Sequence, residues 1–166
     1  MLTPSGGLRD RLRAHPLLGD ALLALLLAAA SVWLRRWDPP ARHPADLLDV
    51  ALTVLGCLPV ALRRRWPFPM LVLAGVPQLV LAAVDRPSGT GALAVLVLVY
   101  TVAAHRGLAL SMLGAAVACL GFALGRLAGP GAGRWGELAV LLILTASAWQ
   151  GGRSRRLRRA YLAELE

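Results

Sequence analysis

The sequence predicts an all-α membrane protein: a six-transmembrane-helix bundle followed by an amphipathic helix at the C-terminus, on the cytoplasmic side. Three observations lead to this prediction. Six long apolar runs are separated by short polar segments, arginines are dense at every second polar segment, and all five tryptophans lie near run ends. Indole side chains concentrate where a bilayer meets water, so the tryptophans support the run boundaries independently of the arginines.

Each apolar run is close to the length of a membrane-spanning helix, about 17–25 residues for a hydrocarbon core of about 30 Å. Helices are expected because lipid offers no partner to backbone N–H and C=O groups. The predicted spans are Pro16–Leu34, Asp46–Leu62, Phe68–Val84, Gly89–Ala104, Leu108–Gly125 and Glu137–Trp149, the fourth and sixth being short. Residues 1–15 then form a basic N-terminus, 16–149 the membrane domain, and 150–166 the start of a cytoplasmic helix.

Prolines agree with these helix boundaries. Pro16 suits the first turn of the first helix, where its missing N–H costs little, and Pro67 marks the start of the third. Pro77 lies near the middle of the third span and predicts a kink there, with Gln78 beside the loosened turn.

The arginines predict the orientation of the bundle. One set of alternate segments carries twelve arginines, including the triplet Arg63, Arg64 and Arg65, and the other set carries six. The richer set belongs in the cytoplasm. Because the number of spans is even, both termini are expected there, in a multi-pass protein of the cell membrane.

Composition supports a membrane partner. The chain has 166 residues, a net charge of +9, 57% hydrophobic residues and 16% charged residues, against about 25% charged in soluble domains. The arginines flank apolar runs, so the predicted partners are the lipid bilayer and its anionic inner-leaflet lipids rather than nucleic acid.

The first run also has features of a cleaved signal peptide. Basic residues precede Leu17–Ala30, and Ser31 follows as a small residue. The apolar run continues to Leu34, however, which is long enough to span. We therefore favour an uncleaved first helix.

Few residues indicate chemistry. His15, His43 and His105 stand at separate span boundaries, and no cluster has metal-ligand spacing. No nucleophile motif or phosphate-binding loop is found, so we expect neither a catalytic site nor a cofactor.

Ionisable groups inside a membrane are the usual candidates for function. Asp20 and Asp49 are such groups, and they are predicted near opposite membrane surfaces. Near the bilayer centre only Pro77 and Gln78 interrupt the apolar pattern, which is weak support for a transporter.

The fifth run carries small residues at helical spacing: Gly114, Ala118, Gly121 and Gly125. Small residues allow two helices to approach closely in lipid. We favour a contact within the bundle, with a homodimer interface as the alternative.

The C-terminal segment predicts an amphipathic helix. After Gly151 and Gly152, a candidate hinge, the chain is rich in helix-forming residues, and Leu157, Tyr161 and Leu165 recur at intervals of four. The alternative is a basic tail that frays in solution.

Four stretches in this order resemble a known family: Arg13–Asp20, Leu58–Pro67, Tyr100–Arg106 and Arg158–Glu166. Together they resemble the N-terminal membrane region of actinobacterial two-component sensor histidine kinases. The resemblance implies that the C-terminal helix leads to a dimerisation and kinase module, with a response regulator as its partner.

Neither the phosphoacceptor box nor the ATP-binding boxes of that family occur in this chain, so no catalytic residue can be transferred. We therefore expect a membrane input region, not itself an enzyme. The alternative is a stand-alone small integral membrane protein, such as an assembly factor or a transporter subunit.

Overall fold

The computed structural model describes residues 16–34, 47–84, 91–128 and 135–164. Within these ranges the chain is helical and contains no strand, which confirms the predicted all-α class. The α-helices are α2 (Pro16–Leu34), α3 (Leu47–Cys57), α4 (Pro67–Ala83), α5 (Gly91–His105), α6 (Leu108–Ala128) and α7 (Trp135–Ala163), and a 3₁₀ helix, η1 (Leu58–Leu62), directly follows α3.

The helix boundaries differ most from the predicted spans at two places. The second predicted span divides into α3 and η1, with Pro59 at the start of the 3₁₀ helix, because proline has no N–H to continue the α-helical bonding. The sixth predicted span ends at Trp149, whereas α7 continues without a break to Ala163.

Only one helix of the described ranges is long and apolar enough to cross a membrane by length and composition, over Leu108–Leu127. Four others are apolar but shorter: Leu18–Trp33, Leu47–Leu62, Pro67–Ala83 and Gly91–His105. Helix length therefore supports one crossing rather than the predicted six. Short helices account for the difference: the fourth predicted span is already short at Gly89–Ala104, and α5 has 15 residues.

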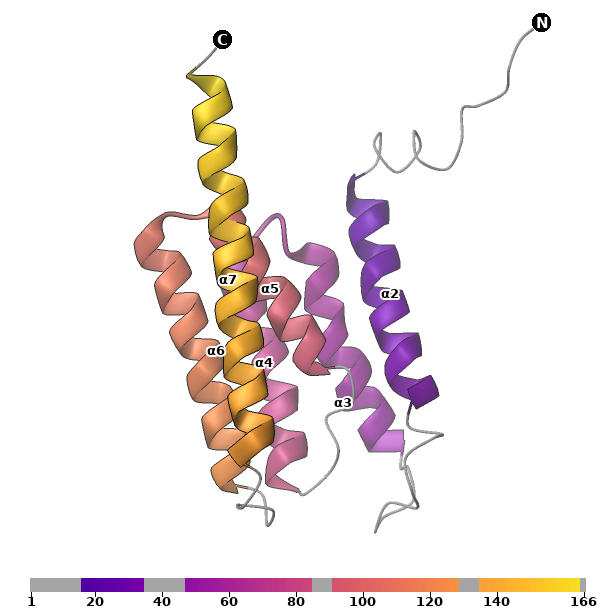
Figure 1. Ribbon diagram of the computed structural model, residues 1–166. Coiled ribbons are helices and arrows are strands. Elements are labelled where there is room, and N and C mark those ends of the chain that lie inside the picture. The colour runs from indigo at the N-terminus through magenta and orange to yellow at the C-terminus, as the bar shows by residue number, and fades with distance from the viewer. Residues whose placement is uncertain (1–15, 35–46, 85–90, 129–134, 165–166) are drawn as a thin grey trace, which may run out of the picture.

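Consecutive helices run in opposite directions, so the described chain passes up and down the bundle (Figure 1). As a result α2 begins and α7 ends at the same end, which also holds the η1–α4 and α5–α6 connections. We call this the arginine-rich end, because Arg63–Arg65, Arg106 and the α7 arginines all lie there. The last turns of α7 project beyond the other helices.

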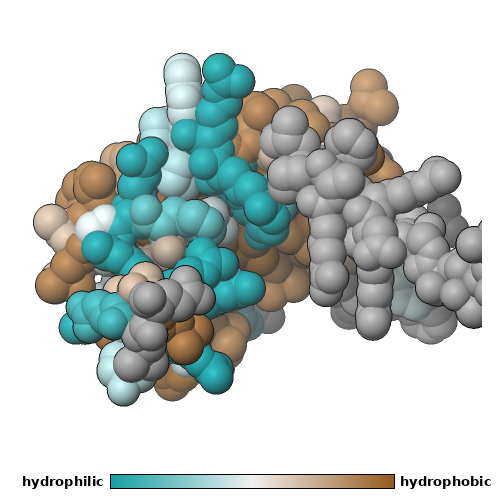
Figure 2. Space-filling view, turned by 90° about the horizontal axis from the view of Figure 1, so that it is seen from above, coloured by the Kyte–Doolittle hydropathy of each residue, from teal (hydrophilic) through white to brown (hydrophobic). Residues whose placement is uncertain are grey.

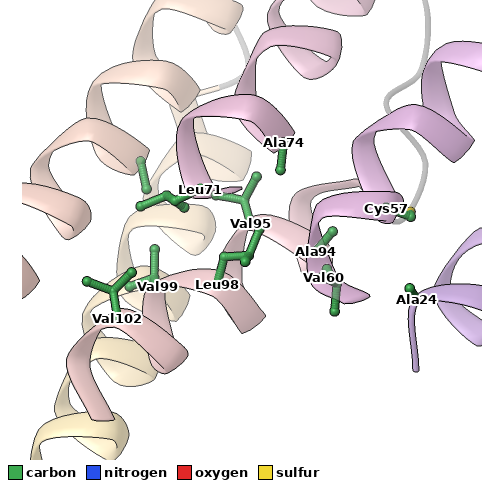
Figure 3. Close-up of a cluster of buried hydrophobic side chains, with 11 residues drawn as sticks. Ala24, Cys57, Val60, Leu71, Ala74, Ala94, Val95, Leu98, Val99 and Val102 are labelled. Atoms are coloured by element: carbon green, nitrogen blue, oxygen red, sulfur yellow. The ribbon is translucent and has the colours of Figure 1, made fainter. Parts of the chain in front are cut away.

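The core of the bundle is built around α5. Most α5 side chains are buried, and α7, α4 and α6 pack around it. Figure 3 shows valines and Leu98 of α5 meeting Leu71 and Ala74 of α4, with Val60 and Cys57 nearby and Ala24 at the edge. Small and branched side chains dominate this cluster, which allows the helices to approach closely.

Large apolar side chains lie on the outside of the bundle. Exposed leucine, isoleucine, valine or tryptophan side chains occur on every described helix, among them Leu25 at 69%, Leu127 at 66% and Ile143 at 64% exposed. In a view onto the arginine-rich end, hydrophilic side chains gather over part of the face and hydrophobic side chains lie around the sides (Figure 2). The outer surface is therefore apolar and one end is basic.

Candidate functional site

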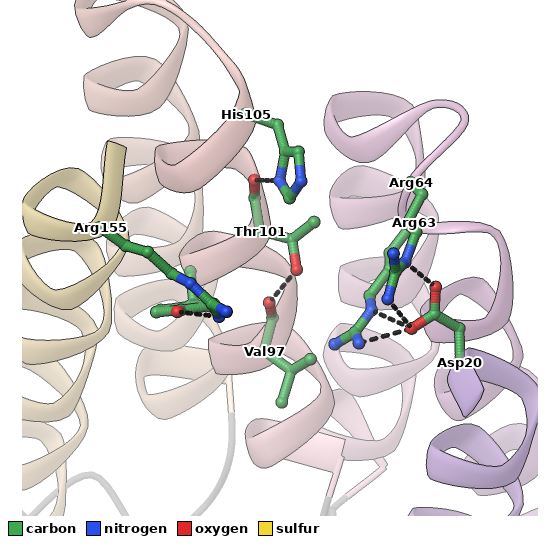
Figure 4. A network of polar contacts seen from close by, with 8 residues as sticks. Asp20, Arg63, Arg64, Val97, Thr101, His105 and Arg155 are labelled. Atoms are coloured by element: carbon green, nitrogen blue, oxygen red, sulfur yellow. Dashed lines mark hydrogen bonds and ion pairs between the residues drawn. The ribbon is translucent and has the colours of Figure 1, made fainter. Parts of the chain in front are cut away.

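A buried carboxylate joins α2 to the end of η1. The Asp20 side chain is 1% exposed and accepts hydrogen bonds from two guanidinium groups (Figure 4). Arg63 donates to Asp20 Oδ1 from Nη2 at 2.6 Å and from Nε at 3.1 Å. Arg64 donates from Nε to Oδ2. We call these three residues the α2–η1 clasp.

The local fold explains why two consecutive arginines reach one carboxylate. A tight turn follows η1, in which Arg65 N–H donates to the Leu62 carbonyl at 3.0 Å and Trp66 N–H donates to the same oxygen at 3.4 Å. This turn presents Arg63 and Arg64 toward α2. Asp20 lies one helical turn after the start of α2. Arg65 forms no ion pair among the residues that the structure describes, and it is exposed.

The pairing was not predicted, although all three residues were candidates. The signal was available: a carboxylate one turn inside an apolar helix needs a cation at the same depth, and the arginine triplet was expected on the same side. Asp49, in contrast, is buried in the first turn of α3 at the opposite end. The positive end of the helix dipole favours a carboxylate at that position.

A second junction connects α7 to α5 at the arginine-rich end. Gly152 is buried, and a Cβ built on it would lie 2.5 Å from the Tyr100 carbonyl oxygen and 2.7 Å from the Ala103 Cβ. Arg155 donates to the Tyr100 hydroxyl at 3.1 Å, and Arg156 donates to the Arg106 carbonyl at 2.6 Å. The glycine permits the close approach and the arginines hold it.

This junction corrects the interpretation of Gly151 and Gly152 as a hinge. Both residues lie inside the continuous helix α7. Glycine in a helix interior has two uses, conformational freedom and absence of a side chain, and at Gly152 the second is required by the α5 backbone. Beyond it, every side chain of Arg153–Glu164 is exposed, while Leu165 lies outside the described residues.

Gln78 occupies a narrow place between α3 and α5. A Cβ on Gly56 would come within 2.7 Å of its Nε2, and a Cβ on Gly91 would overlap its amide group. The amide nitrogen and oxygen are both buried and have no hydrogen-bond partner in the described part of the chain. Helix α4 passes through the neighbouring Pro77, and the predicted kink stays a prediction.

The small residues of α6 face the interior of the same chain. A Cβ on Gly114 would contact Leu71 and Val102 at 3.3–3.4 Å, and Ala118 is 5% exposed. A Cβ on Gly125 would contact Ala82 at 3.3 Å, whereas Gly121 has no neighbour within 4 Å among the residues described. Three of the four positions therefore pack within the bundle, mainly against α4.

Two contacts that link α6 with α7 were not predicted from the sequence. Arg126 and Glu137 form an ion pair of 2.5 Å at the end opposite the arginine-rich end. Trp149 donates from Nε1 to Ser111 Oγ at 3.3 Å, and the guanidinium of Arg153 lies 5.4 Å from the centre of its ring. Residues 11 and 38 positions apart in separate helices carry no local signal of such pairing.

The histidines and acids do not assemble into a metal-binding group within the described ranges. His105 is exposed and donates from Nδ1 to the Thr101 carbonyl at 3.0 Å (Figure 4), while His15 and His43 lie outside those ranges. The described residues form two contacts between helices, the α2–η1 clasp and the α5–α7 junction, and a concentration of positive charge at one end.

In comparison with protein families, residues 8–159 match the family described as "Domain of unknown function (DUF7134)". No curated protein and no solved structure matches the chain.

Proposed function

The chain belongs to the DUF7134 family, and we propose that it is a multi-pass membrane input module that passes a signal through α7 to a cytoplasmic output module. The resemblance to two-component sensor histidine kinases suggests a dimerisation and kinase module as that output. The proposal has two parts, the membrane location and the direction of transmission, which rest on different observations.

The apolar outer surface supports the membrane location. Monomeric soluble proteins rarely expose contiguous apolar patches larger than a few hundred Å², whereas large apolar side chains are exposed on all helices here. The acyl chains of a bilayer would cover such a surface without exposing it to water. The short helix α5 is compatible with a crossing, because it is surrounded by its neighbours and need not contact lipid along its whole length.

The antiparallel order supports the predicted topology. Six helices that alternate in direction bring the start of α2 and the end of α7 to one end, where the arginines are concentrated. A positively charged end is the one expected in the cytoplasm.

The continuity of α7 is the observation that carries the proposed transmission. One unbroken helix of 29 residues runs from the bundle, through the Gly152 contact with α5, to exposed turns beyond the other helices. A helix transmits displacement along its axis because its backbone hydrogen bonds keep it stiff. A shift of α5 against its neighbours would therefore move the projecting end of α7, and a two-state output could respond to this.

Topology mapping tests the first part. Reporter fusions at the two ends of the chain and in the α6–α7 connection should place both ends in the cytoplasm and the connection outside. Ends on opposite sides of the membrane, or a protein recovered entirely in the soluble fraction, would overturn the membrane proposal.

Insertions into a chimaera test the second part. The chain is fused to a kinase core whose activity can be assayed, and one to four residues are inserted after Arg159, beyond the contacts of Arg155 and Arg156 with α5. Each inserted residue rotates the downstream helix by about 100°, so activity should vary with insertion length. A seven-residue insertion, close to two full turns, should restore it. Equal activity for all lengths would rule out transmission through α7.

A further inference from the structure

We infer that the α2–η1 clasp and the adjoining Arg65 form a binding site for the phosphate headgroup of an anionic phospholipid. The inference rests on the proposed membrane location and names one lipid class and one place on the bundle. It goes beyond general attraction between basic residues and an anionic surface.

The charges at the clasp do not balance. Asp20 supplies one carboxylate, and Arg63, Arg64 and Arg65 supply three guanidinium groups within one turn. No other described acid pairs with these arginines. Among the residues that the structure describes, one carboxylate thus faces three cations, and the excess positive charge favours an anion at this place.

The two more exposed guanidinium groups are those of Arg64 and Arg65. The side chain of Arg63 is 18% exposed and donates to Asp20 from Nε and Nη2. Arg64 donates to Asp20 from Nε and, at 3.4 Å, from Nη2, but its side chain is 51% exposed. Arg65 is exposed as well. Guanidinium groups with free N–H donors bind phosphate oxygens in a paired geometry, and Asp20 holds Arg64 in place for this.

Exposed apolar side chains lie next to the charged ones, as a phospholipid with a charged headgroup and apolar acyl chains requires. Leu18 and Leu22 flank Asp20 on α2, and Leu58 and Leu62 precede the arginines on η1. All four are exposed, between 51% and 57%. Trp66 follows the triplet and is 59% exposed, as expected for an indole at headgroup level. Phosphate would thus contact the arginines, and acyl chains would lie along the leucines.

The arginines of α7 are a useful contrast. Arg159 carries the same charge at the same end of the molecule, but it lies in the projecting part of α7, where neighbouring side chains are all exposed. Among the described residues, no buried carboxylate is paired with it.

Native mass spectrometry of the full chain in detergent tests the inference. Phosphatidylglycerol and phosphatidylcholine are titrated into the wild-type chain and into Arg64→Gln, Arg65→Gln and Arg159→Gln, which all lose one charge. We expect wild type to prefer phosphatidylglycerol. A cation near an anionic headgroup contributes about 1 kcal/mol, so Arg64→Gln and Arg65→Gln should each bind about fivefold more weakly, while Arg159→Gln should not.

Three results would overturn the site. Equal losses in all three variants would show diffuse electrostatic attraction. Equal binding of both lipids would show that the phosphate charge is not recognised. Competition by soluble glycerol phosphate at the lipid's own concentration would show that the leucines do not contribute. Flotation of the wild-type chain with vesicles is measured separately, so failure of this site remains distinguishable from failure of the membrane location.

Discussion

Replacement of Gly152 by alanine should weaken the contact between α7 and α5. The added Cβ would lie 2.5 Å from the Tyr100 carbonyl oxygen, 2.7 Å from the Ala103 Cβ and 3.1 Å from the Ala104 nitrogen. Two of these three atoms belong to the backbone of α5, which cannot turn aside as a side chain can. The helices would have to separate.

The size of the effect follows from these distances. Ordinary contact begins near 3.4 Å, so α7 would move away from α5 by about 1 Å to remove the overlap. Overpacking of this kind costs about 1–3 kcal/mol. Alanine gains about 0.5–1 kcal/mol over glycine in a helix interior, so we expect a net loss of about 1–2 kcal/mol in the free energy of unfolding.

The adjacent glycine provides the control. A Cβ on Gly151 would meet ring carbons of Tyr100 at 3.7–3.8 Å, an ordinary contact, so Gly151→Ala should be neutral or stabilising by about 0.5–1 kcal/mol. Both variants are compared with wild type by denaturant titration in detergent micelles, followed by circular dichroism. Equal stabilities of the two variants would refute the close approach of α7 to α5.

Three further predictions concern other contacts. Arg63→Gln should destabilise the fold by about 1–3 kcal/mol, because it removes two charge-assisted hydrogen bonds to a buried carboxylate that keeps Arg64 as a partner, while Arg65→Gln should have little effect on the same unfolding titration. Gln78→Leu should stabilise the bundle by about 1–3 kcal/mol, because it removes a buried amide whose polar atoms lack partners in the described chain; a loss of stability in thermal unfolding would show that the amide is paired. Gly114→Val should lower the melting temperature and Gly121→Val should not, since only the first faces neighbouring side chains; equal shifts would contradict the packing of α6.

The helices themselves were predictable because they depend on local sequence. Apolar runs bounded by arginine, proline and glycine specify where a helix can form, and α2 begins and ends at the predicted residues. The small residues of α6 could likewise be identified as packing positions from their spacing alone. Which helix they face was open until the structure placed α4 against them.

Local sequence was less informative where a helix could either stop or continue. Two consecutive glycines predict a break in a helix considered alone. In the bundle, α5 lies so close to α7 that only glycine fits at position 152, and the helix continues. The number of membrane crossings is also hard to predict from local sequence, because apolar composition does not give the length of a helix. Helix α5, for example, has 15 residues and is enclosed by its neighbours.

By itself, the sequence determined an all-helical chain with basic ends, the positions of most helices, and which residues were unusual in an apolar setting. Only the tertiary structure decided that Asp20 binds Arg63 and Arg64, that Gln78 is packed between two glycines, and that Gly152 is a contact rather than a hinge. Helix formation depends on neighbours within one or two turns, whereas these contacts join residues 13 or more positions apart. Their partners become neighbours only when the helices pack.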